Sequence, residues 1–510
     1  NGGKLIVVDP RLTPTARAAS LHLRLVPGSD AALANGLLHL LVRMGSIDQE
    51  YIRTRTENFE QVKAVVASYW PDRVERITGV SEPHLIRAAE LLGEANTAMV
   101  MTARGPEQQS QGVRNTLCYI NLALALGKVG KPFSGYGTLT GQGNGQGGRE
   151  HGQKTDQLPG YRKISDPEAR HHMARLWGIP ESEIPGPGKS AYQMLDSLGE
   201  QDGVHALLVV GSNLAVSAPN SLNIRERLRS SLDFLAVADF FLSETAQLAD
   251  VVFPSAQWAE EEGTVTNLEG RVILRKRATA PPGEVRTDIG LLCDLAACLG
   301  KQSFFRYANT REVFEELRLA SAGGIADYSG ISYEKIADAQ GIFWPCPAKD
   351  HPGTPRLFQE TFPTPSGKAK FHAVRHESQA EEPDMQYPFY LTTGRILAQY
   401  QSGTQTRRVD ELNGLAPEPV AELHPDVARA YQLVEGAMVA LITRRGSARF
   451  KVKFAPGIQH DTVFVPFHWG EAQAVNQLTN PALDPTSHMP EFKVCAVRIE
   501  NAGARPLNDE

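Results

Sequence analysis

The sequence contains few cysteines, and none of them stands in a recognisable pairing pattern. Five occur in 510 residues, and no two form a CxxC pair or show the spacing of a metal site. A disulfide-built secreted scaffold is therefore excluded, and the composition is typical of a reducing compartment. Cys293, Cys298 and Cys495 occur in apolar runs, so we expect all three to pack in hydrophobic cores.

Two further features are missing: an excess of basic residues and an apolar run long enough to cross a membrane. The net charge of −6 at pH 7 disfavours nucleic acid and anionic membranes as partners. Hydrophobic residues make up 41% of the chain and charged residues 22%, as in ordinary globular proteins. We expect about three domains, no nucleic-acid partner and no membrane partner.

The chain also lacks an initial methionine. It begins at Asn1 and enters an apolar run within a few residues. We therefore expect a fragment of a longer protein whose N-terminal portion is missing. On this interpretation, the absence of a signal peptide carries no information about the intact protein.

The most distinctive stretch is LTGQGNGQGGREHGQKTDQLPGY, residues 139–161. It shows neither helical nor strand periodicity, and its six glycines between Gly141 and Gly152 permit close approach to another group. Side-chain amides suit the edges of a heterocycle, and Arg149, which is followed by Glu150, suits a planar oxyanion. The amides are Gln142, Asn144, Gln146, Gln153 and Gln157. A binding loop and a flexible surface loop both remain open at this point.

Part of this stretch, GNGQGG at 143–148, satisfies the dinucleotide pattern GxGxxG. That pattern should follow directly on an apolar strand. The preceding residues 134–140 read SGYGTLT, which is not an apolar run. We therefore reject a Rossmann interpretation of this loop.

Short apolar runs alternate with helical patterns over the first half of the chain, which predicts βαβ units and a parallel sheet. The expected strands are 4–9, 97–102, 204–210, 234–238 and 250–254, and the expected helices are 31–43, 59–69, 84–92 and 166–177. Asp30 is placed to cap the first of these helices. His171 and His172 lie in the last one, and adjacent residues face different sides of a helix, so we expect no metal site there.

Four of these strands end in small or acidic residues: Asp9, Gly105, Gly211 to Asn213, and Asp239. In open α/β sheets, ligands bind beyond the carboxyl ends of the strands. A carboxylate there can accept from both the N1–H and the amine of a guanine. For each aspartate alone a turn or helix cap is the alternative; their recurrence in two α/β segments favours a pair of nucleotide-like sites.

The C-terminal third has a different pattern. Residues 309–382 are rich in proline and read as an irregular connector. From Tyr387 onward the expected strands are 438–443, 448–454, 462–467 and 492–499, with a hairpin at Arg444 to Ser447. We predict a separate compact β domain, a barrel, and place the domains at 1–141, 142–375 and 386–500.

Seven segments occur in the order found in molybdopterin oxidoreductases of the dimethyl sulfoxide reductase family, which the chain resembles over nearly its whole length. They are VVDPRLTPTA, LVPGSD, LTGQGNGQGGRE, GSNLAVS, ADVVFPSAQWAEEEGTVTNLEGR, LTTGR and NQLTNPALDPTSHMPEFKVCAV. The resemblance implies parallel-sheet α/β domains around a molybdenum bis(molybdopterin guanine dinucleotide) cofactor, with a C-terminal barrel of the double-psi type.

The resemblance also implies which residues bind this cofactor. Asp9 and Asp30 would border one guanosine, with Arg104, Gly105 and Gln108 along the same dinucleotide, and Gly211, Asn213, Ser217 and Asp239 would surround the other. The central loop would add Gly141 and Gln142, and the β domain Thr393, Gly394, Arg395, Asn476 and Lys493. Lysine and arginine suit a pyrophosphate and an electron-rich dithiolene.

Within the family, Thr140 and the Arg149–Glu150 pair are similar to cytoplasmic assimilatory nitrate reductases. Arg149 would be the catalytic residue, because a guanidinium can hold planar nitrate through two parallel hydrogen bonds; an ion pair with Glu150 or a pterin contact is the alternative. Formate oxidation is a second hypothesis. A third is a metal-free structural subunit resembling the large iron–sulfur subunit of complex I, which the retained Asp9, Asp239 and Asn476 disfavour.

The family's iron–sulfur cysteines and its molybdenum ligand would lie before Asn1, and none of the five cysteines matches either motif. We therefore name no metal ligand in this chain and expect a 4Fe-4S or similar cluster only in the missing portion. The resemblance implies nitrate as the substrate, nitrate assimilation as the role and the cytoplasm as the location. It also implies an external electron donor, such as a ferredoxin or a reductase subunit.

Overall fold

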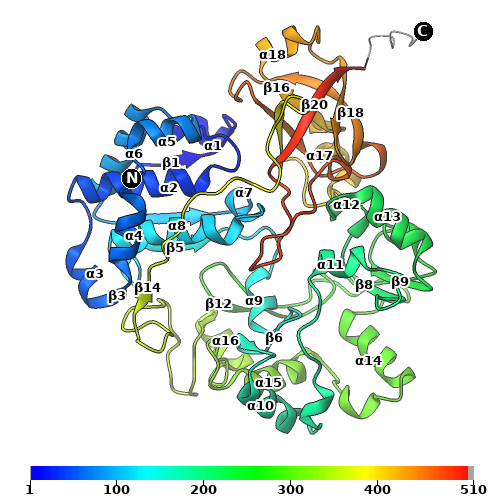
Figure 1. Ribbon diagram of the computed structural model, residues 1–510. Coiled ribbons are helices and arrows are strands. Elements are labelled where there is room, and N and C mark those ends of the chain that lie inside the picture. Colours follow the sequence, from blue (N-terminus) through cyan, green and yellow to red (C-terminus); the bar gives the residue numbers. More distant parts are fainter. Residues whose placement is uncertain (1, 503–510) are drawn as a thin grey trace. The chain divides into compact units, whose positions relative to one another are not determined.

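The computed structural model describes residues 2–502, and the chain divides into two compact units (Figure 1). Unit 1 contains Asn1–Leu139, Leu214–Arg225 and Phe358–Glu510, and unit 2 contains Thr140–Asn213 and Glu226–Leu357. The chain therefore leaves unit 1 at the start of the glycine-rich stretch and returns to it for the C-terminal third. The three domain boundaries expected from the sequence stay a prediction.

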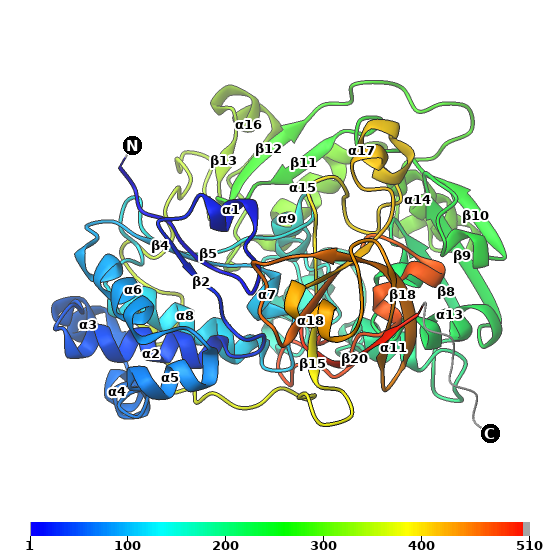
Figure 2. The ribbon, with the colours of Figure 1, turned by 90° about the horizontal axis from the view of Figure 1, so that it is seen from above.

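The N-terminal part of unit 1 is an α/β region with two parallel strand pairs, β1 with β2 and β4 with β5. The strands are β1 (Ile6–Val8), β2 (Leu21–Leu23), β4 (Met99–Thr102) and β5 (Gly135–Thr138), with short β3 (Thr56–Glu57) and β14 (Ala369–Lys370) pairing elsewhere. The helices are α1 (Pro14–Arg17), α2 (Asp30–Arg43), α3 (Gln49–Arg55), α4 (Phe59–Val66), α5 (Pro71–Thr78), α6 (Glu82–Glu94), α7 (Arg104–Glu107) and α8 (Gly112–Ala125). The core forms around α2, which packs against α5, α6 and α8 (Figure 2).

One expectation for this region is wrong. Ser29, not Asp30, is the N-cap of α2 and makes no capping hydrogen bond, while Asp30 is the first helical residue and is buried. The stretch before the glycine-rich loop is not an apolar run, yet its residues 135–138 form β5, which pairs with β4 in parallel register. Tertiary pairing here outweighs a glycine-rich composition.

The C-terminal part of unit 1 is a closed barrel of six strands in the order β15-β19-β16-β18-β17-β20, which confirms the predicted barrel. The strands are β15 (Phe389–Gly394), β16 (Val420–Leu423), β17 (Met438–Thr443), β18 (Gly446–Phe454), β19 (Thr462–Pro466) and β20 (Cys495–Asn501), with helices α17 (Asp410–Leu415) and α18 (Pro425–Ala430) between them. Buried and exposed side chains alternate along β18, as its apolar–basic alternation predicts. Closure leaves the barrel without an open sheet edge.

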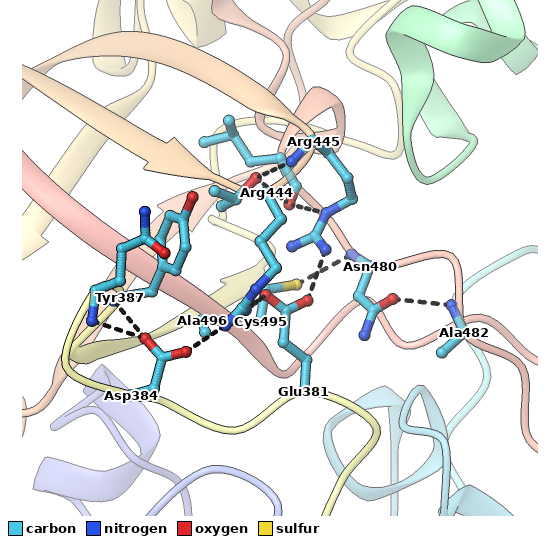
Figure 3. A network of polar contacts seen from close by, with 12 residues as sticks. Glu381, Asp384, Tyr387, Arg444, Arg445, Asn480, Ala482, Cys495 and Ala496 are labelled. Carbon is cyan, nitrogen blue, oxygen red and sulfur yellow. Dashed lines mark hydrogen bonds and ion pairs between the residues drawn. The ribbon is translucent and has the colours of Figure 1, made fainter.

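A network of ion pairs around the buried carboxylate of Glu381 attaches the segment before the barrel to the β17–β18 hairpin (Figure 3). The carboxylate of Glu381 accepts from Arg444 Nη1 and Arg445 Nη1, both at 2.6 Å. Arg444 also donates to Asp384 at 2.5 Å, and its guanidinium lies 4.6 Å from the Tyr387 ring centroid. Two arginines on one buried carboxylate therefore fix this part of the connector to the barrel.

Unit 2 is built on a parallel sheet in the order β10-β9-β8 and an antiparallel sheet in the order β11-β12-β13. The strands are β8 (Ala206–Val210), β9 (Phe234–Asp239), β10 (Val251–Pro254), β11 (Gly263–Thr266), β12 (Arg271–Arg275) and β13 (Ile342–Phe343), with the short pair β6 (Gln157–Leu158) and β7 (Arg162–Lys163). The helices are α9 (Gly145–Glu150), α10 (Pro167–Trp177), α11 (Ala191–Asp196), α14 (Asp288–Cys298), α15 (Thr310–Ser321) and α16 (Tyr333–Ala339). The parallel sheet confirms the α/β class.

Helices α12 (Leu214–Ser217) and α13 (Ser221–Ser230) follow β8, and the boundary between the units falls within α13. None of the helices in the described part of the chain is both long enough and apolar enough to cross a membrane.

Three expectations for unit 2 are wrong. Part of the supposed irregular connector forms α15 and α16, because Phe314, Leu317 and Ala320 give α15 buried apolar positions. Phe314 and Leu317 pack in one local core and Ala320 in another. The glycine-rich stretch contains the short helix α9. Cys298 is exposed at the end of α14 and Cys293 is half-buried, whereas Cys495 of unit 1 is buried as expected.

Candidate cofactor and substrate sites

Lys493 lies at the centre of the candidate cofactor site in unit 1. It is buried, and its ammonium donates to the Thr393 carbonyl at 2.8 Å, and to the Thr393 hydroxyl at 3.4 Å. Its backbone N–H donates to the Gln108 carbonyl at 3.2 Å, and the Thr393 hydroxyl donates to the carbonyl preceding Lys493 at 2.9 Å. The fold thus brings together three predicted residues from three distant segments of the chain.

Three cations meet here with little negative charge to balance them. Burial, and then the charges of Arg395 and Arg104, lower the pKa of Lys493 to about 7. Burial and Arg104 likewise lower the pKa of Arg395, while Arg104 pairs with Glu107 at 3.0 Å. Lys493 is buried, Arg104 is half-buried and Arg395 is exposed. Mutually repelling cations are expected where an anionic group binds, so this site fits a pyrophosphate or an electron-rich dithiolene.

The carboxyl end of β1 reaches the barrel beside this cluster. Asp9 accepts from the backbone N–H of Arg11 at 2.8 Å, and burial raises the pKa of Asp9, against the lowering effects of Arg11, His22 and Lys493. Arg11 lies 3.4 Å from the Phe464 ring centroid and pairs with Glu422 at 2.7 Å. Two barrel side chains therefore fix the turn that carries Asp9.

Asp30 and Gly105 are joined by a residue that sequence reasoning missed. Gln109 donates one N–H to the Asp30 carboxylate and another to the Gly105 carbonyl, both at 2.9 Å. Burial raises the pKa of Asp30, against the lowering effects of hydrogen bonds from Gln109 and Tyr119. The predicted neighbour Gln108 is half-buried, and its side-chain N–H donates to the Met489 sulfur at 3.9 Å. The adjacent glutamines were the only signal, and sequence alone does not say which one faces Asp30.

His468 is a second residue that sequence reasoning missed. It is fully buried, its Nε2 accepts from the Ile396 N–H at 3.0 Å, and its Nδ1 lies 2.6 Å from the Gln401 carbonyl. Burial lowers its pKa to about 4, with smaller contributions from Arg395 and Lys493. A neutral imidazole therefore supports the turn after β15 that carries Arg395.

Two further predicted residues have tight packing roles in unit 1. A side chain on Gly394 would place its Cβ 2.6 Å from the Phe464 ring, so only glycine fits at this end of β15. Asn476 is buried and donates to the Val216 carbonyl at 2.8 Å, which places it beside Ser217 at the end of α12. Ser217 itself is exposed.

In unit 2 the carboxyl ends of β8 and β9 carry Gly211, Asn213 and Asp239. The N–H of Gly211 donates to the Ala238 carbonyl at 2.9 Å, and Gly211 adopts a φ of +58° with open space around its Cα. Asn213 accepts from the Thr245 hydroxyl at 2.9 Å. Asp239 is buried and accepts at 2.8 Å from the Phe240 N–H and the Ser243 hydroxyl. Asp239 therefore closes a local turn, which is the alternative that the sequence left open, at the carboxyl end of β9; its role at a guanosine stays a prediction.

The glycine-rich loop presents Arg149 from α9. Gly141 is half-buried and Gln142 exposed at the start of the loop. The half-buried Arg149 guanidinium forms no hydrogen bond or ion pair with any residue of the described chain, 2–502. The ion pair with Glu150, which the sequence left open, is absent because Glu150 is buried and bonded to Thr266 and Tyr328 instead. Arg149 therefore has its donors available for a small anion.

Among the described residues, one group has metal-ligand character: His424, Asp426 and His460 of the barrel, whose ligand atoms lie within 4.8 Å of one another. Arg429 already pairs with Asp426 at 2.6 Å. Burial and then His460 lower the pKa of His424, and the charges of Arg24 and Arg429 act in the same direction. These two arginines near the group disfavour a bound cation, so we assign no metal to it.

The α/β regions, the barrel and the cluster of Lys493, Arg395 and Arg104 define a protein that binds an anionic, dinucleotide-type cofactor. Residues 1–298 match the family model of molybdopterin oxidoreductases, and residues 389–496 match that of the molydopterin dinucleotide binding domain. The chain belongs to the molybdopterin oxidoreductase family. Its cofactor is molybdenum bis(molybdopterin guanine dinucleotide), which the cationic site in unit 1 fits.

Similar proteins include a nitrate reductase subunit and a formate dehydrogenase subunit. The chain is 46% identical to the assimilatory nitrate reductase catalytic subunit of Bacillus subtilis, over 98% of this chain and 70% of that protein. It is 38% identical to the F420-dependent formate dehydrogenase subunit alpha of Methanocaldococcus jannaschii, over 98% and 72% of the two chains. Acetylene hydratase from Pelobacter acetylenicus shares the fold, with a TM-score of 0.74 at 19% identity over 98% and 74%.

Proposed function

We propose that this chain is the cofactor-binding portion of an assimilatory nitrate reductase. It would act in the cytoplasm and receive electrons from an external donor such as a ferredoxin or a reductase subunit. The overall reaction consumes nitrate, two electrons and two protons, and yields nitrite and water. The 46% identity to a nitrate reductase of this type supports the substrate.

The observation that carries the proposal is the available guanidinium of Arg149. Nitrate is a planar monoanion, and a guanidinium presents two parallel N–H groups in the matching geometry. Because Arg149 makes no hydrogen bond or ion pair within the described residues, binding an anion would break no existing contact. The positive charge of Arg149 would also stabilise the negative charge that develops on the departing oxygen as nitrate is converted to nitrite.

When bound, the molybdenum cofactor would supply the two-electron redox chemistry of nitrate reduction. The chain's own residues hold and orient the reactants. In unit 1, Lys493, Arg395 and Arg104 would neutralise the cofactor's anionic groups, with Asp9 and Asp30 at one guanosine. In unit 2, Asp239 and Asn213 would hold the other guanosine, while Arg149 would orient nitrate.

Replacing Arg149 by alanine in the holoenzyme tests this proposal. We expect nitrate-dependent oxidation of a reduced dye to fall by about 10²-fold, the usual loss when one charged donor is removed from a reacting oxyanion, with molybdenum content unchanged. Arg175→Ala on α10 is the matched control, because Arg175 is an exposed arginine of the same unit. Wild-type turnover in Arg149→Ala would contradict the assigned role.

Formate oxidation is the second candidate, favoured by the 38% identity to a formate dehydrogenase subunit. Formate is also a planar monoanion that Arg149 could hold. The same holoenzyme distinguishes the two, because formate-dependent dye reduction without nitrate turnover would transfer the assignment. If the protein purified from a host that makes the cofactor contains no molybdenum, the result would instead indicate a structural subunit.

A further inference from the structure

The residue next to Arg149 carries a buried carboxylate that the proposed mechanism does not use. Glu150 is the last residue of α9 and is only 1% exposed. One of its oxygens, Oε2, accepts from the Thr266 hydroxyl at 2.9 Å and from the Tyr328 hydroxyl. The other, Oε1, is buried and has no hydrogen bond to the described residues. This carboxylate is thus held by two neutral hydroxyls, with one oxygen left unsatisfied.

No cation forms an ion pair with this carboxylate among residues 2–502. The titratable groups around it are Arg149 and His151 on its own segment, Tyr161 after the glycine-rich loop, and Tyr328 between α15 and α16. Burial lowers the pKa of His151 to about 4, so His151 is neutral at pH 7. Burial raises the pKa of Glu150, against the lowering effects of Tyr328, Thr266 and Trp344 and the smaller effect of the Arg149 charge, and no ion pair forms between Glu150 and Arg149.

The helix that carries both residues cannot maintain its own position. Helix α9 has six residues, GQGGRE, of which three are glycines, and so short a glycine-rich helix is unstable alone. Thr266, the last residue of β11, anchors both of its ends: its N–H donates to the Asn144 side chain at 2.9 Å, and its hydroxyl donates to Glu150. A Cβ at position 147 would lie 2.2 Å from that Asn144 oxygen, so the contact between Asn144 and Thr266 requires glycine at this position.

Adjacent carboxylate and guanidinium groups would ordinarily attract each other. If the Glu150 carboxylate turned towards Arg149, it would occupy the donors that a substrate anion needs, because carboxylate and nitrate present the same paired oxygens. Thr266 and Tyr328 hold the carboxylate in a buried position instead. The fold therefore keeps a competing internal anion away from the arginine.

We propose that Glu150 is a positioning residue whose capture by Thr266 and Tyr328 keeps Arg149 open to a planar monoanion, and this rests on the substrate role proposed for Arg149. The hydroxyl of Tyr328 is thereby a determinant of substrate affinity although it does not touch the substrate. Releasing the carboxylate would create an intramolecular competitor, and neutralising the carboxylate would remove it.

The test measures nitrate affinity in holoenzyme variants, by calorimetric titration of the oxidised form and by KM in the dye assay. We expect Tyr328→Phe to raise the Kd and the KM for nitrate roughly tenfold, the effect of one charge-assisted hydrogen bond, with kcat little changed. Thr266→Val should act in the same direction. Tyr333→Phe is the matched control, because it removes a half-buried tyrosine hydroxyl that bonds Thr310 in the same unit.

Two measurements separate this mechanism from a merely structural loss. Glu150→Gln introduced into the Tyr328→Phe enzyme should restore nitrate affinity, because the competing charge is gone while the shape is kept. The KM of Tyr328→Phe should also fall towards the wild-type value at acidic pH, where the released carboxylate becomes protonated. A general packing defect predicts neither rescue.

The outcomes distinguish this inference from the proposed function. If Arg149→Ala abolishes nitrate binding but Tyr328→Phe and Thr266→Val bind nitrate as the wild type does, the positioning role is overturned and the substrate role stands. A raised KM that Glu150→Gln fails to restore overturns it equally. Unchanged nitrate binding in Arg149→Ala overturns the substrate role and this inference with it.

Discussion

Replacing Lys493 by methionine should stabilise the cofactor-free protein while preventing it from retaining the cofactor. Lys493 is buried beside Arg395 and Arg104, and its pKa falls from 10.5 to about 7. In the absence of a bound anion, the folded protein therefore carries an ammonium that is more stable in the unfolded chain. Methionine has similar length and no charge, so it removes this penalty.

The lowered pKa sets both the size and the pH range of the effect. A fall from 10.5 to about 7 corresponds to a cost of roughly 5 kcal/mol, fully present below pH 7 and diminishing up to pH 10.5. The sign follows because the unfolded chain binds more protons in this range, so stability rises with pH. Losing the hydrogen bonds to Thr393 offsets about 1–3 kcal/mol, which leaves a net gain of about 2–4 kcal/mol at pH 6.

Urea unfolding of cofactor-free wild-type and Lys493→Met protein, from pH 6 to pH 9.5, measures this difference. We expect the variant to be the more stable at pH 6 and to lose about 3 kcal/mol of that advantage by pH 9.5. In a host that makes the cofactor, the variant should contain little molybdenum, whereas Lys370→Met, at an exposed lysine, should match the wild type. A stability difference that does not change with pH would refute the reasoning.

Two further predictions concern buried polar contacts in unit 1. Glu381→Ala should lower the free energy of unfolding by about 3–5 kcal/mol, because it leaves two arginines without their shared buried carboxylate. Removing the exposed Glu377 carboxylate should cost less than about 1 kcal/mol. Equal losses of the two variants in urea unfolding would contradict this prediction. Asn476→Ala should cost about 1–3 kcal/mol by leaving a buried carbonyl unsatisfied, and an unchanged melting temperature would show that water replaces the amide.

Local sequence patterns predicted the architecture correctly in segments that have a single, clear hydrophobic pattern. The apolar–basic alternation at 449–454 predicted a strand of the barrel, and the barrel is closed as expected. Short apolar runs followed by Asp or Gly predicted parallel strands, and β8, β9 and β10 pair in parallel. In each case the structure is fixed by which apolar side chains are buried, and these side chains can be identified from the sequence.

Composition misled where tertiary contacts outweighed it. Glycines and prolines suggested irregular structure at 139–161 and 309–382, yet α9, α15 and α16 form there. Helix α15 had a readable apolar face, which the nearby prolines obscured. Helix α9 had none, and its existence depends on contacts with Thr266, which lies more than a hundred residues away in the chain.

The sequence by itself determined the class of the protein, because seven ordered segments and two kinds of periodicity identify the family and its α/β and barrel parts. It also selected the charged residues, because few residue types suit a pyrophosphate or a planar oxyanion. Only the tertiary structure decided which of them meet: that Lys493 lies near Arg395 and Arg104, that Gln109 contacts Asp30, and that Glu150 binds Thr266 instead of Arg149. Such pairings depend on contacts between distant segments, and adjacency in the chain does not encode them.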